Sequence, residues 1–388
     1  MSSSEKIADV FKTVGLPTVT YVKRDQGSFE RRLNGALDEK GKLCLVTGPS
    51  KTGKTTLYKE VLSSRGEIPL VVACDGKKTS DEIWKLALEA VDFDRVESRQ
   101  HSDAGKVGLE VGADGKLGWQ WLAQISTRLK AQFEKTHSET DVRKKVLAEP
   151  GPDLLVPILK HSNYTLVIED FHYLKDEEKI NLFQQWKRFI DNEISVIVLG
   201  TTHRAVDIAD SNKDLLGRIA QIDVGHWSDE DLKSIAKVGF KYLRVGIAPE
   251  IVDRIATEAV GLPIVVQQVC LELFNGKNIF TVDRAKKATA VFTEDGLKVS
   301  FNRVAHQNYT QFKPYYETLI SGPREKARKY RTYELVLACF TLDPIRFSLK
   351  RGEIDARLTR LELPVGELPP AASMNSTLGA LKKIPREA

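Results

Sequence analysis

Short runs of apolar residues, each followed by polar residues, recur through the first half of the chain. They lie at residues 42–47 (KLCLVT), 69–76 (PLVVACDG), 164–174 (YTLVIEDFHYL) and 194–204 (ISVIVLGTTHR). Unbroken apolar runs of this length are typical of parallel strands, because helices cover both faces of a parallel sheet. The runs therefore predict an α/β fold built on a parallel sheet.

Apolar residues at helical spacing lie between and after these runs. They predict one helix over residues 55–62, a second over 80–91 and three amphipathic helices within 228–275. The alternation of strands and helices indicates a three-layer αβα core, and the three later helices indicate a separate helical domain.

Another apolar stripe lies near the N-terminus. We expect a helix that begins at Ser4 and ends at residues 15–17, with an apolar face made of Ile7, Val10, Phe11 and Val14. Such a face either packs back onto the rest of the protein or docks a partner, and packing is the default.

The second and third runs are separated by more chain than a strand–helix–strand unit of about 30 residues needs. The excess lies near residues 93–150 and indicates an insertion. Within it, residues 107–121 predict a β-hairpin with Trp119 and Trp121 on one face, and residues 126–145 predict a basic helix. The insertion either contacts a partner or nucleic acid, or pads a surface or subunit interface.

A glycine-rich segment joins the first predicted strand to the helix after it. Residues 47–56 read TGPSKTGKTT, and the spacing Gly48-x4-Gly53-Lys54-Thr55 fits the phosphate-binding loop pattern GxxxxGK[ST]. In this pattern, backbone N–H groups surround the β-phosphate at the positive end of the helix dipole. The expected nucleotide ligands are Gly48, Pro49, Ser50, Lys51, Thr52, Gly53, Lys54, Thr55 and Thr56.

Two acids end the third apolar run. Lys54 would reach the β- and γ-phosphates and Thr55 would ligate Mg²⁺, so an acid from a neighbouring strand is needed to complete the metal site. Glu169 is expected to hold the metal shell, and Asp170 is expected to lie nearest the attacking water. The alternative is that the two acids only cap the next helix.

The fourth run ends in polar residues. Thr201 follows it at the carboxyl end of the predicted strand, where ligands of parallel sheets bind. Its hydroxyl either senses the γ-phosphate or is a solvated loop group.

Composition and charge indicate the cellular compartment and the possible partners, but they identify no further site residues. The 388 residues are 41% hydrophobic and 29% charged, and the formal net charge of +5 permits a polyanionic partner without demanding one. Four widely spaced cysteines indicate buried free thiols in a reducing compartment. The polar N-terminus is unlike a signal peptide and no apolar run reaches membrane-spanning length, so we expect a cytoplasmic protein.

These motifs resemble ATPases of the AAA+ and STAND branch of the P-loop NTPases, particularly those related to origin-recognition initiators. Residues 20–37 (TYVKRDQGSFERRLNGAL) resemble the N-terminal box of that group, and residues 215–240 resemble its arginine-finger segment running into a helical lid. The resemblance implies ATP and Mg²⁺ as cofactors. It also implies that Arg218 reaches the γ-phosphate of a neighbouring subunit in a homo-oligomer, unless Arg218 is only a surface ion-pair residue.

Other positions follow or depart from the family pattern. Gly261-Leu262-Pro263 is similar to the GxP signature of STAND proteins, which implies that Pro263 packs near adenine. The helix after it lacks the second sensor arginine of many AAA+ machines. The family order of the two acids is Asp then Glu, whereas this chain has Glu169 then Asp170. These departures favour a slow, nucleotide-gated switch over a fast motor.

The C-terminal part resembles a winged-helix domain. Residues 333–342, 351–363 and 373–384 show three short helical patterns, and the last would be a recognition helix carrying Lys382 and Lys383. The module either reads DNA or serves as a packing unit.

The resemblance gives the following domain prediction: an N-terminal helix (1–16), a P-loop ATPase core (17–225), a helical lid (226–290), a helical linker (291–332) and a winged-helix-like domain (333–388). The first hypothesis for the function is a switch ATPase that oligomerises with nucleotide and signals to a partner or effector. The resemblance implies prokaryotic antiviral defence as its setting. The second is a DNA-acting AAA+ ATPase, such as an initiator, a transposition regulator or a loader. The third is a module that binds nucleotide without turnover.

Overall fold

The computed structural model describes residues 5–90, 151–201, 217–288, 290–321, 329–342, 349–361, 363–364 and 366–381. The hairpin and basic helix expected within 93–150 lie outside these ranges, as do Lys382 and Lys383. The chain divides into two compact units. One unit is Lys23–Val224, and the other joins Met1–Val22 to Gly225–Ala388.

The unit Lys23–Val224 is built on a five-stranded parallel sheet with the strand order β2-β3-β4-β1-β5. Its strands are β1 (Leu43–Thr47), β2 (Ile68–Ala73), β3 (Tyr164–Glu169), β4 (Val196–Gly200) and β5 (Ile219–Asp223). The parallel sheet predicted from the apolar runs is confirmed. The fifth strand, β5, lies in the segment that the sequence assigned to the arginine finger.

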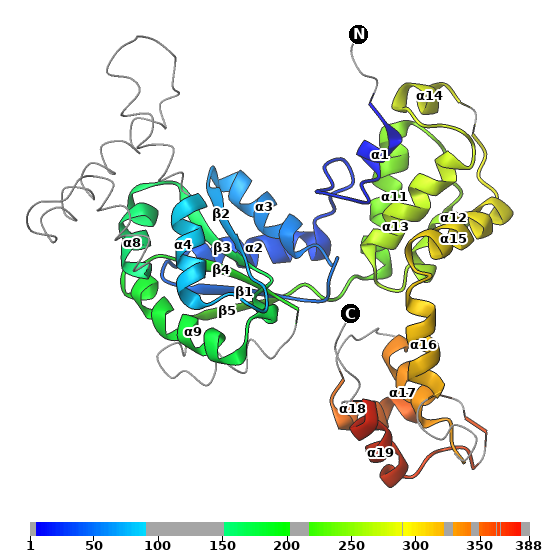
Figure 1. Ribbon diagram of the computed structural model, residues 1–388. Helices are drawn as coiled ribbons and strands as arrows, with labels where there is room; N and C mark the ends of the chain where they lie inside the picture. The colour runs from blue at the N-terminus through cyan, green and yellow to red at the C-terminus, as the bar shows by residue number, and fades with distance from the viewer. Residues whose placement is uncertain are drawn as a thin grey trace, which may run out of the picture. The chain divides into compact units, whose positions relative to one another are not determined.

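Helices cover both faces of this sheet, which makes the predicted three-layer αβα core (Figure 1). One face packs against α2 (Ser28–Asp38) and α3 (Lys54–Arg65). The other packs against α4 (Ser80–Ala90), α8 (Pro152–His161) and α9 (Asp176–Asp191).

The side chains of β1 show why the run of residues 42–47 is apolar throughout. Leu43 and Leu45 join the cluster under α4, α8 and α9, whereas Cys44 and Val46 join the cluster under α2 and α3. Successive side chains of a strand point to opposite faces, so a strand covered on both faces needs apolar residues at every position.

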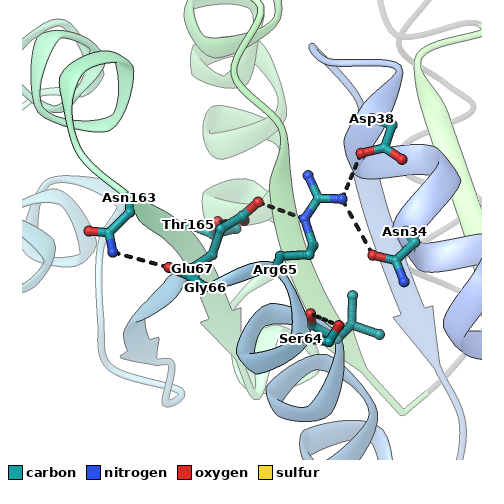
Figure 2. A network of polar contacts seen from close by, with 9 residues as sticks. Asn34, Asp38, Ser64, Arg65, Gly66, Glu67, Asn163 and Thr165 are labelled. Carbon is teal, nitrogen blue, oxygen red and sulfur yellow. Dashed lines mark hydrogen bonds and ion pairs between the residues drawn. The ribbon is translucent and has the colours of Figure 1, made fainter.

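A polar network ties helices to strands at the end of the sheet where the strands begin (Figure 2). Arg65, at the end of α3, pairs with Asp38 of α2 and with Glu67, each at 2.6 Å. Glu67 also accepts a hydrogen bond from the Thr165 hydroxyl of β3, and Asn163 donates to the carbonyl of Gly66 at 3.1 Å. The phosphate-binding loop follows the opposite end of β1, so this network stabilises the frame without entering the loop.

The second unit contains a helical bundle. Its helices are α1 (Ile7–Val10), α11 (Asp229–Leu243), α12 (Pro249–Glu258), α13 (Pro263–Asn275), α14 (Val282–Lys287) and α15 (Glu294–Asn308). The three amphipathic helices predicted within 228–275 are confirmed, and the hydroxyl of Ser228 caps α11 by accepting a hydrogen bond from the Asp231 N–H at 3.1 Å.

The N-terminal helix is shorter than the sequence pattern indicated. Ile7, Val10 and Phe11 are buried against α11 and α13, so this part of the stripe packs back onto the protein. The prediction is wrong for Val14, which is 88% exposed, because the helix ends at Val10.

The C-terminal part of the described chain contains α16 (Phe312–Ser321), α17 (Thr332–Thr341), α18 (Arg351–Leu358) and α19 (Ala371–Leu381). The last three pack around one small apolar cluster of Val336, Cys339, Ile354, Leu358 and Met374. They coincide with the three predicted helices, although α18 stops at Leu358 and not at residue 363. The winged-helix assignment stays a prediction.

Candidate nucleotide-binding site

The loop between β1 and α3 has a backbone that depends on its glycines. Gly48 has φ 148° and Gly53 has φ 94°, both in the region that residues with a Cβ rarely adopt. Lys51, between them, also has a positive φ, 64°. The loop therefore turns back on itself and delivers the chain to the first turn of α3.

The first turn of α3 provides N–H groups for an anion. The N–H of Leu57 bonds the carbonyl of Gly53 at 2.9 Å, which is the first bond of the helical ladder. The N–H groups of Lys54, Thr55 and Thr56 precede it and have no partner within the helix, as at the start of any α-helix. Free N–H groups and the positive end of a helix dipole favour an anion, so this turn is the candidate site for phosphate.

The Lys54 ammonium lies over the loop. Its Nζ donates to the carbonyls of Gly48 and Pro49, each at 2.7 Å. Burial lowers the pKa of Lys54, and the charges of Asp170 and Glu169 partly oppose that shift. A half-buried cation held against two carbonyls is available to phosphate oxygens, which are stronger acceptors for it.

A carboxylate from β3 reaches the helix that follows the loop. The Thr55 hydroxyl donates to Glu169 Oε1 at 3.0 Å, and the Tyr58 hydroxyl donates to the same oxygen at 3.1 Å. β4 lies between β1 and β3, so the contact depends on α3 returning across the sheet. The structure thus brings together Lys54, Thr55 and Glu169, as the sequence reasoning expected of a metal and phosphate site.

Asp170 differs from Glu169 in position and backbone. It is exposed, has φ 58°, and begins the short helix η2 (Phe171–Tyr173). The Asp170 side chain makes no capping hydrogen bond, although its carbonyl accepts from the Tyr173 N–H at 3.0 Å. The alternative that this acid only caps the next helix is therefore not supported by a side-chain contact. Its charge also lies close enough to Lys54 to raise the pKa of that lysine.

Thr201 lies directly after β4, the strand between the one that leads into the loop and the one that carries the acids. This places it at the carboxyl edge of the sheet, beside both. Its role as a sensor of the γ-phosphate stays a prediction.

Arg218 lies at the opposite end of the sheet, where the parallel strands begin. It is exposed and precedes β5, and its carbonyl accepts from the N–H of Leu43, the first residue of β1, at 2.8 Å. The loop begins after Thr47, the last residue of β1, so the full length of the strand separates Arg218 from the loop of its own chain. Arg218 cannot reach a phosphate bound by its own loop, and its expected role requires another subunit.

Pro263 belongs to the second unit. It is the first residue of α13, and the preceding residues Val260 (φ 50°) and Gly261 (φ 77°) form a left-handed turn. A positive φ is rare for a β-branched residue such as Val260, which makes this turn strained. The predicted contact of Pro263 with adenine stays a prediction.

The segment that resembles an N-terminal box begins the core unit. Arg24 is 5% exposed, donates to the carbonyl of Val224 at 3.0 Å and lies over the ring of Phe29 at 4.5 Å. Arg24 therefore joins the beginning of this unit to its last residue, Val224. Next to it, Asp25 and Gln26 both have positive φ, which marks a second strained turn.

Two residues of the site were not identified from the sequence. Tyr58 is buried and bonds Glu169, and a helical period places it one turn after Thr55 on the same face of α3. His172 lies two positions after Asp170, and its Nδ1 is buried with no hydrogen-bond partner among the described residues. Burial lowers the pKa of His172, while the charge of Asp170 raises it and that of Lys54 lowers it further. Their positions in the sequence, three residues after Thr55 for Tyr58 and two residues after Asp170 for His172, could have identified them.

The donor set fits Mg²⁺ with a nucleotide. A threonine hydroxyl and a carboxylate are hard oxygen ligands, and Mg²⁺ sites of this kind are completed by phosphate oxygens and water. Among the described residues, no group of three or more His, Cys, Asp or Glu residues could hold a metal ion unaided. Thr55 and Glu169 would hold Mg²⁺ together with the phosphates that the loop is predicted to bind.

The remaining findings concern the chain as a whole. All four cysteines are free and buried, and burial raises the pKa of both Cys44 and Cys74 to about 12. In the part of the chain that the structure describes, no helix has both the length and the apolar character needed to span a bilayer.

Comparison with known proteins gives structural neighbours only. No family model matches the chain. No curated protein matches it either. A Walker-type ATPase of Pyrococcus abyssi aligns with 16% identity and a TM-score of 0.47, over 92% of this chain and 89% of the other. The Aeropyrum pernix Orc1 protein in complex with DNA aligns with 14% identity and a TM-score of 0.43, over 96% and 85%. Cdc6p from Pyrobaculum aerophilum aligns with 11% identity and a TM-score of 0.43, over 97% and 89%.

Proposed function

We propose that the protein is an ATP-binding and slowly hydrolysing ATPase of the AAA+ type that acts as a nucleotide-gated switch. The observation that carries the proposal is the 3.0 Å hydrogen bond from the Thr55 hydroxyl to Glu169, beside the Lys54 ammonium. A phosphate-binding loop alone explains binding of an anion. A carboxylate fixed on the threonine of that loop explains binding of a nucleotide with Mg²⁺.

Each residue has a defined task in this proposal. The N–H groups at the start of α3 and the Lys54 ammonium bind the phosphates. The Thr55 hydroxyl donates a hydrogen bond to Glu169, so the lone pairs of its oxygen remain for the metal. Asp170 would orient and deprotonate the attacking water. Bound Mg²⁺ would neutralise charge on the β- and γ-phosphates.

Slow turnover follows from the placement of the two acids. Glu169 is occupied by Thr55 and Tyr58, and its longer side chain serves the metal side of the site. The shorter Asp170 is left for the water, and it is exposed with no side-chain cap that holds it. A general base that is not held in place loses part of its catalytic effect, because proton transfer needs hydrogen-bond distance.

The position of Arg218 supports assembly of several copies. Because it lies at the opposite end of the sheet from its own loop, the finger role proposed for it needs a second subunit. The test is light scattering with and without a slowly hydrolysed ATP analogue, and we expect the mass to rise when the analogue binds.

A mixing experiment separates this role from a surface ion pair. Arg218→Ala protein keeps an intact loop, and Lys54→Ala protein keeps an intact arginine. If Arg218 acts on a neighbour, each variant alone hydrolyses ATP at about 1% of the wild-type rate, and mixing the two restores part of the activity. Unchanged activity of Arg218→Ala contradicts the role. ATP and GTP are compared in the same assay, because the choice of ATP rests on resemblance.

Signalling to a partner, antiviral defence and DNA binding stay predictions. The described helix α19 carries no lysine or arginine, and Lys382 and Lys383 lie outside the described residues. DNA binding that falls steeply between about 50 and 200 mM salt would favour the DNA-acting alternative, since release of counterions gives that dependence.

A further inference from the structure

Tyr58 is an unusual residue to find beside a phosphate-binding loop. It lies one turn into α3 and its side chain is 0% exposed, packed in the apolar cluster that also contains Val167 of β3 and Leu199 of β4. A tyrosine buried this deeply needs a partner for its hydroxyl, because an unpaired buried hydroxyl is costly. The partner here is the carboxylate of Glu169 at 3.1 Å.

Two hydroxyls therefore meet one carboxylate oxygen. Thr55 and Tyr58 are three positions apart on α3, which puts them on the same face of the helix. Both donate to Oε1 of Glu169, at 3.0 Å and 3.1 Å, so neither occupies Oε2. The Tyr58 hydroxyl is protonated at neutral pH, as any tyrosine is, so it can donate this hydrogen bond.

The hydrogen bond from Tyr58 is important because the Glu169 side chain is long. A glutamate has one more methylene and one more rotatable bond than an aspartate, so a single hydrogen bond from Thr55 leaves more of its orientations open. The buried ring of Tyr58 cannot move far, and its hydroxyl restricts the carboxylate to one orientation.

We propose that Tyr58 is a positioning residue for the metal: it fixes the Glu169 carboxylate so that Oε1 faces Thr55 and Oε2 is left for the magnesium site. Tyr58 touches neither nucleotide nor metal in this arrangement and acts through Glu169. The inference rests on the proposed function, because it concerns the Mg²⁺ that accompanies the nucleotide.

The test measures ATP binding by calorimetry, once with excess Mg²⁺ and once with EDTA, for wild-type protein and Tyr58→Phe. The variant keeps the ring and removes only the hydroxyl. We expect the affinity of Tyr58→Phe for ATP to fall about tenfold with Mg²⁺, as for other partners of metal ligands, and to be unchanged in EDTA. Tyr309→Phe is the matched control, because it removes another tyrosine hydroxyl that donates a hydrogen bond, to Gln268 at 2.8 Å in the second unit.

The outcomes separate the inference from the proposed function. Equal affinities of wild-type protein and Tyr58→Phe with Mg²⁺, or equal losses with Mg²⁺ and with EDTA, overturn the inference alone. Wild-type protein that binds no ATP in either condition overturns the proposed function and the inference with it.

A second variant covers the case in which Tyr58→Phe is too unstable for calorimetry. The increase in melting temperature that Mg²⁺ adds to ATP-saturated protein is compared in wild type, Tyr58→Phe, Glu169→Gln and the double variant. If Tyr58 acts through Glu169, Tyr58→Phe lowers this increase in the wild-type background and lowers it no further in Glu169→Gln. Independent losses that add together contradict the inference, because they show that Tyr58 does not act through Glu169.

Discussion

The Thr55 hydroxyl donates a 3.0 Å hydrogen bond to Glu169, a residue 114 positions further along the chain. Thr55 lies in the first turn of the helix after the loop, and Glu169 ends a strand that is separated from β1 by β4. This contact joins the predicted phosphate-binding half of the candidate site to its predicted metal-binding half.

Replacing Lys54 tests the phosphate half. Lys54→Ala removes an ammonium that two loop carbonyls hold at 2.7 Å. Loss of a charge-assisted hydrogen bond worth about 1.5–3 kcal/mol should weaken ATP binding about 10- to 100-fold. Calorimetry measures this, with Lys59→Ala on the same helix as the control. Equal losses in the two variants would show that general charge, and not contact with phosphate, attracts the nucleotide.

Replacing Asp170 tests the hydrolytic step. Asp170 has φ 58°, and asparagine tolerates this left-handed conformation, so Asp170→Asn removes the charge without new backbone strain. ATP binding should be retained while the steady-state release of phosphate falls about 100-fold. Unchanged release of phosphate from Asp170→Asn would mean that Asp170 does not activate the attacking water. If wild-type protein releases no phosphate, the third hypothesis, a module that binds nucleotide without turnover, follows.

Gly239 tests the packing of the N-terminal segment on α11. A Cβ at this position would overlap the ring of Phe11, which lies among Phe240 and Phe274 with centroid distances of 5.7 Å and 6.1 Å. Gly239→Ala should lower the free energy of unfolding by about 1–3 kcal/mol, despite the better helix propensity of alanine. Gly379→Ala in α19 is the control, since a Cβ there meets no atom within 4 Å. Thermal denaturation compares the two, and a stabilised Gly239→Ala would show that Phe11 is free to move aside.

The buried thiols predict a loss of stability in alkaline solution. Burial raises the pKa of Cys44 and Cys74 to about 12, above the value of about 8.5 expected in the unfolded chain. The folded state therefore keeps protons that the unfolded state releases, so the stabilisation is complete below about pH 8.5 and is lost as the pH rises toward 12. Each thiol should cost about 1.4 kcal/mol per pH unit above that point.

Two measurements check the thiol prediction. The melting temperature should fall between pH 8 and pH 10. At pH 8, a thiol reagent should label none of the four cysteines until denaturant is added. Rapid labelling of the native protein at pH 8 would contradict the burial of these side chains.

Local sequence patterns were sufficient for most of the elements of the core. Strands β1 to β4 and helix α3 follow from apolar runs and a loop pattern whose causes lie within a few residues. The prediction of a buried helical face in the N-terminal segment is wrong at Val14, because the burial of a residue is not set by its local sequence. Helical spacing predicted a buried face there, but burial depends on whether another element covers the residue, and none does.

The sequence by itself determined the predicted phosphate-binding half of the candidate site, because Gly48, Gly53, Lys54 and Thr55 are close in the chain and the loop depends on backbone conformations that glycine adopts without strain. Only the tertiary structure decided through which contacts distant groups meet the loop. The strand order brings Glu169 to Thr55, adds the Tyr58 hydroxyl to the same oxygen, and places Arg218 at the opposite end of the sheet. Contacts between residues so far apart in the chain depend on how strands are ordered and helices cross them, which no local pattern specifies.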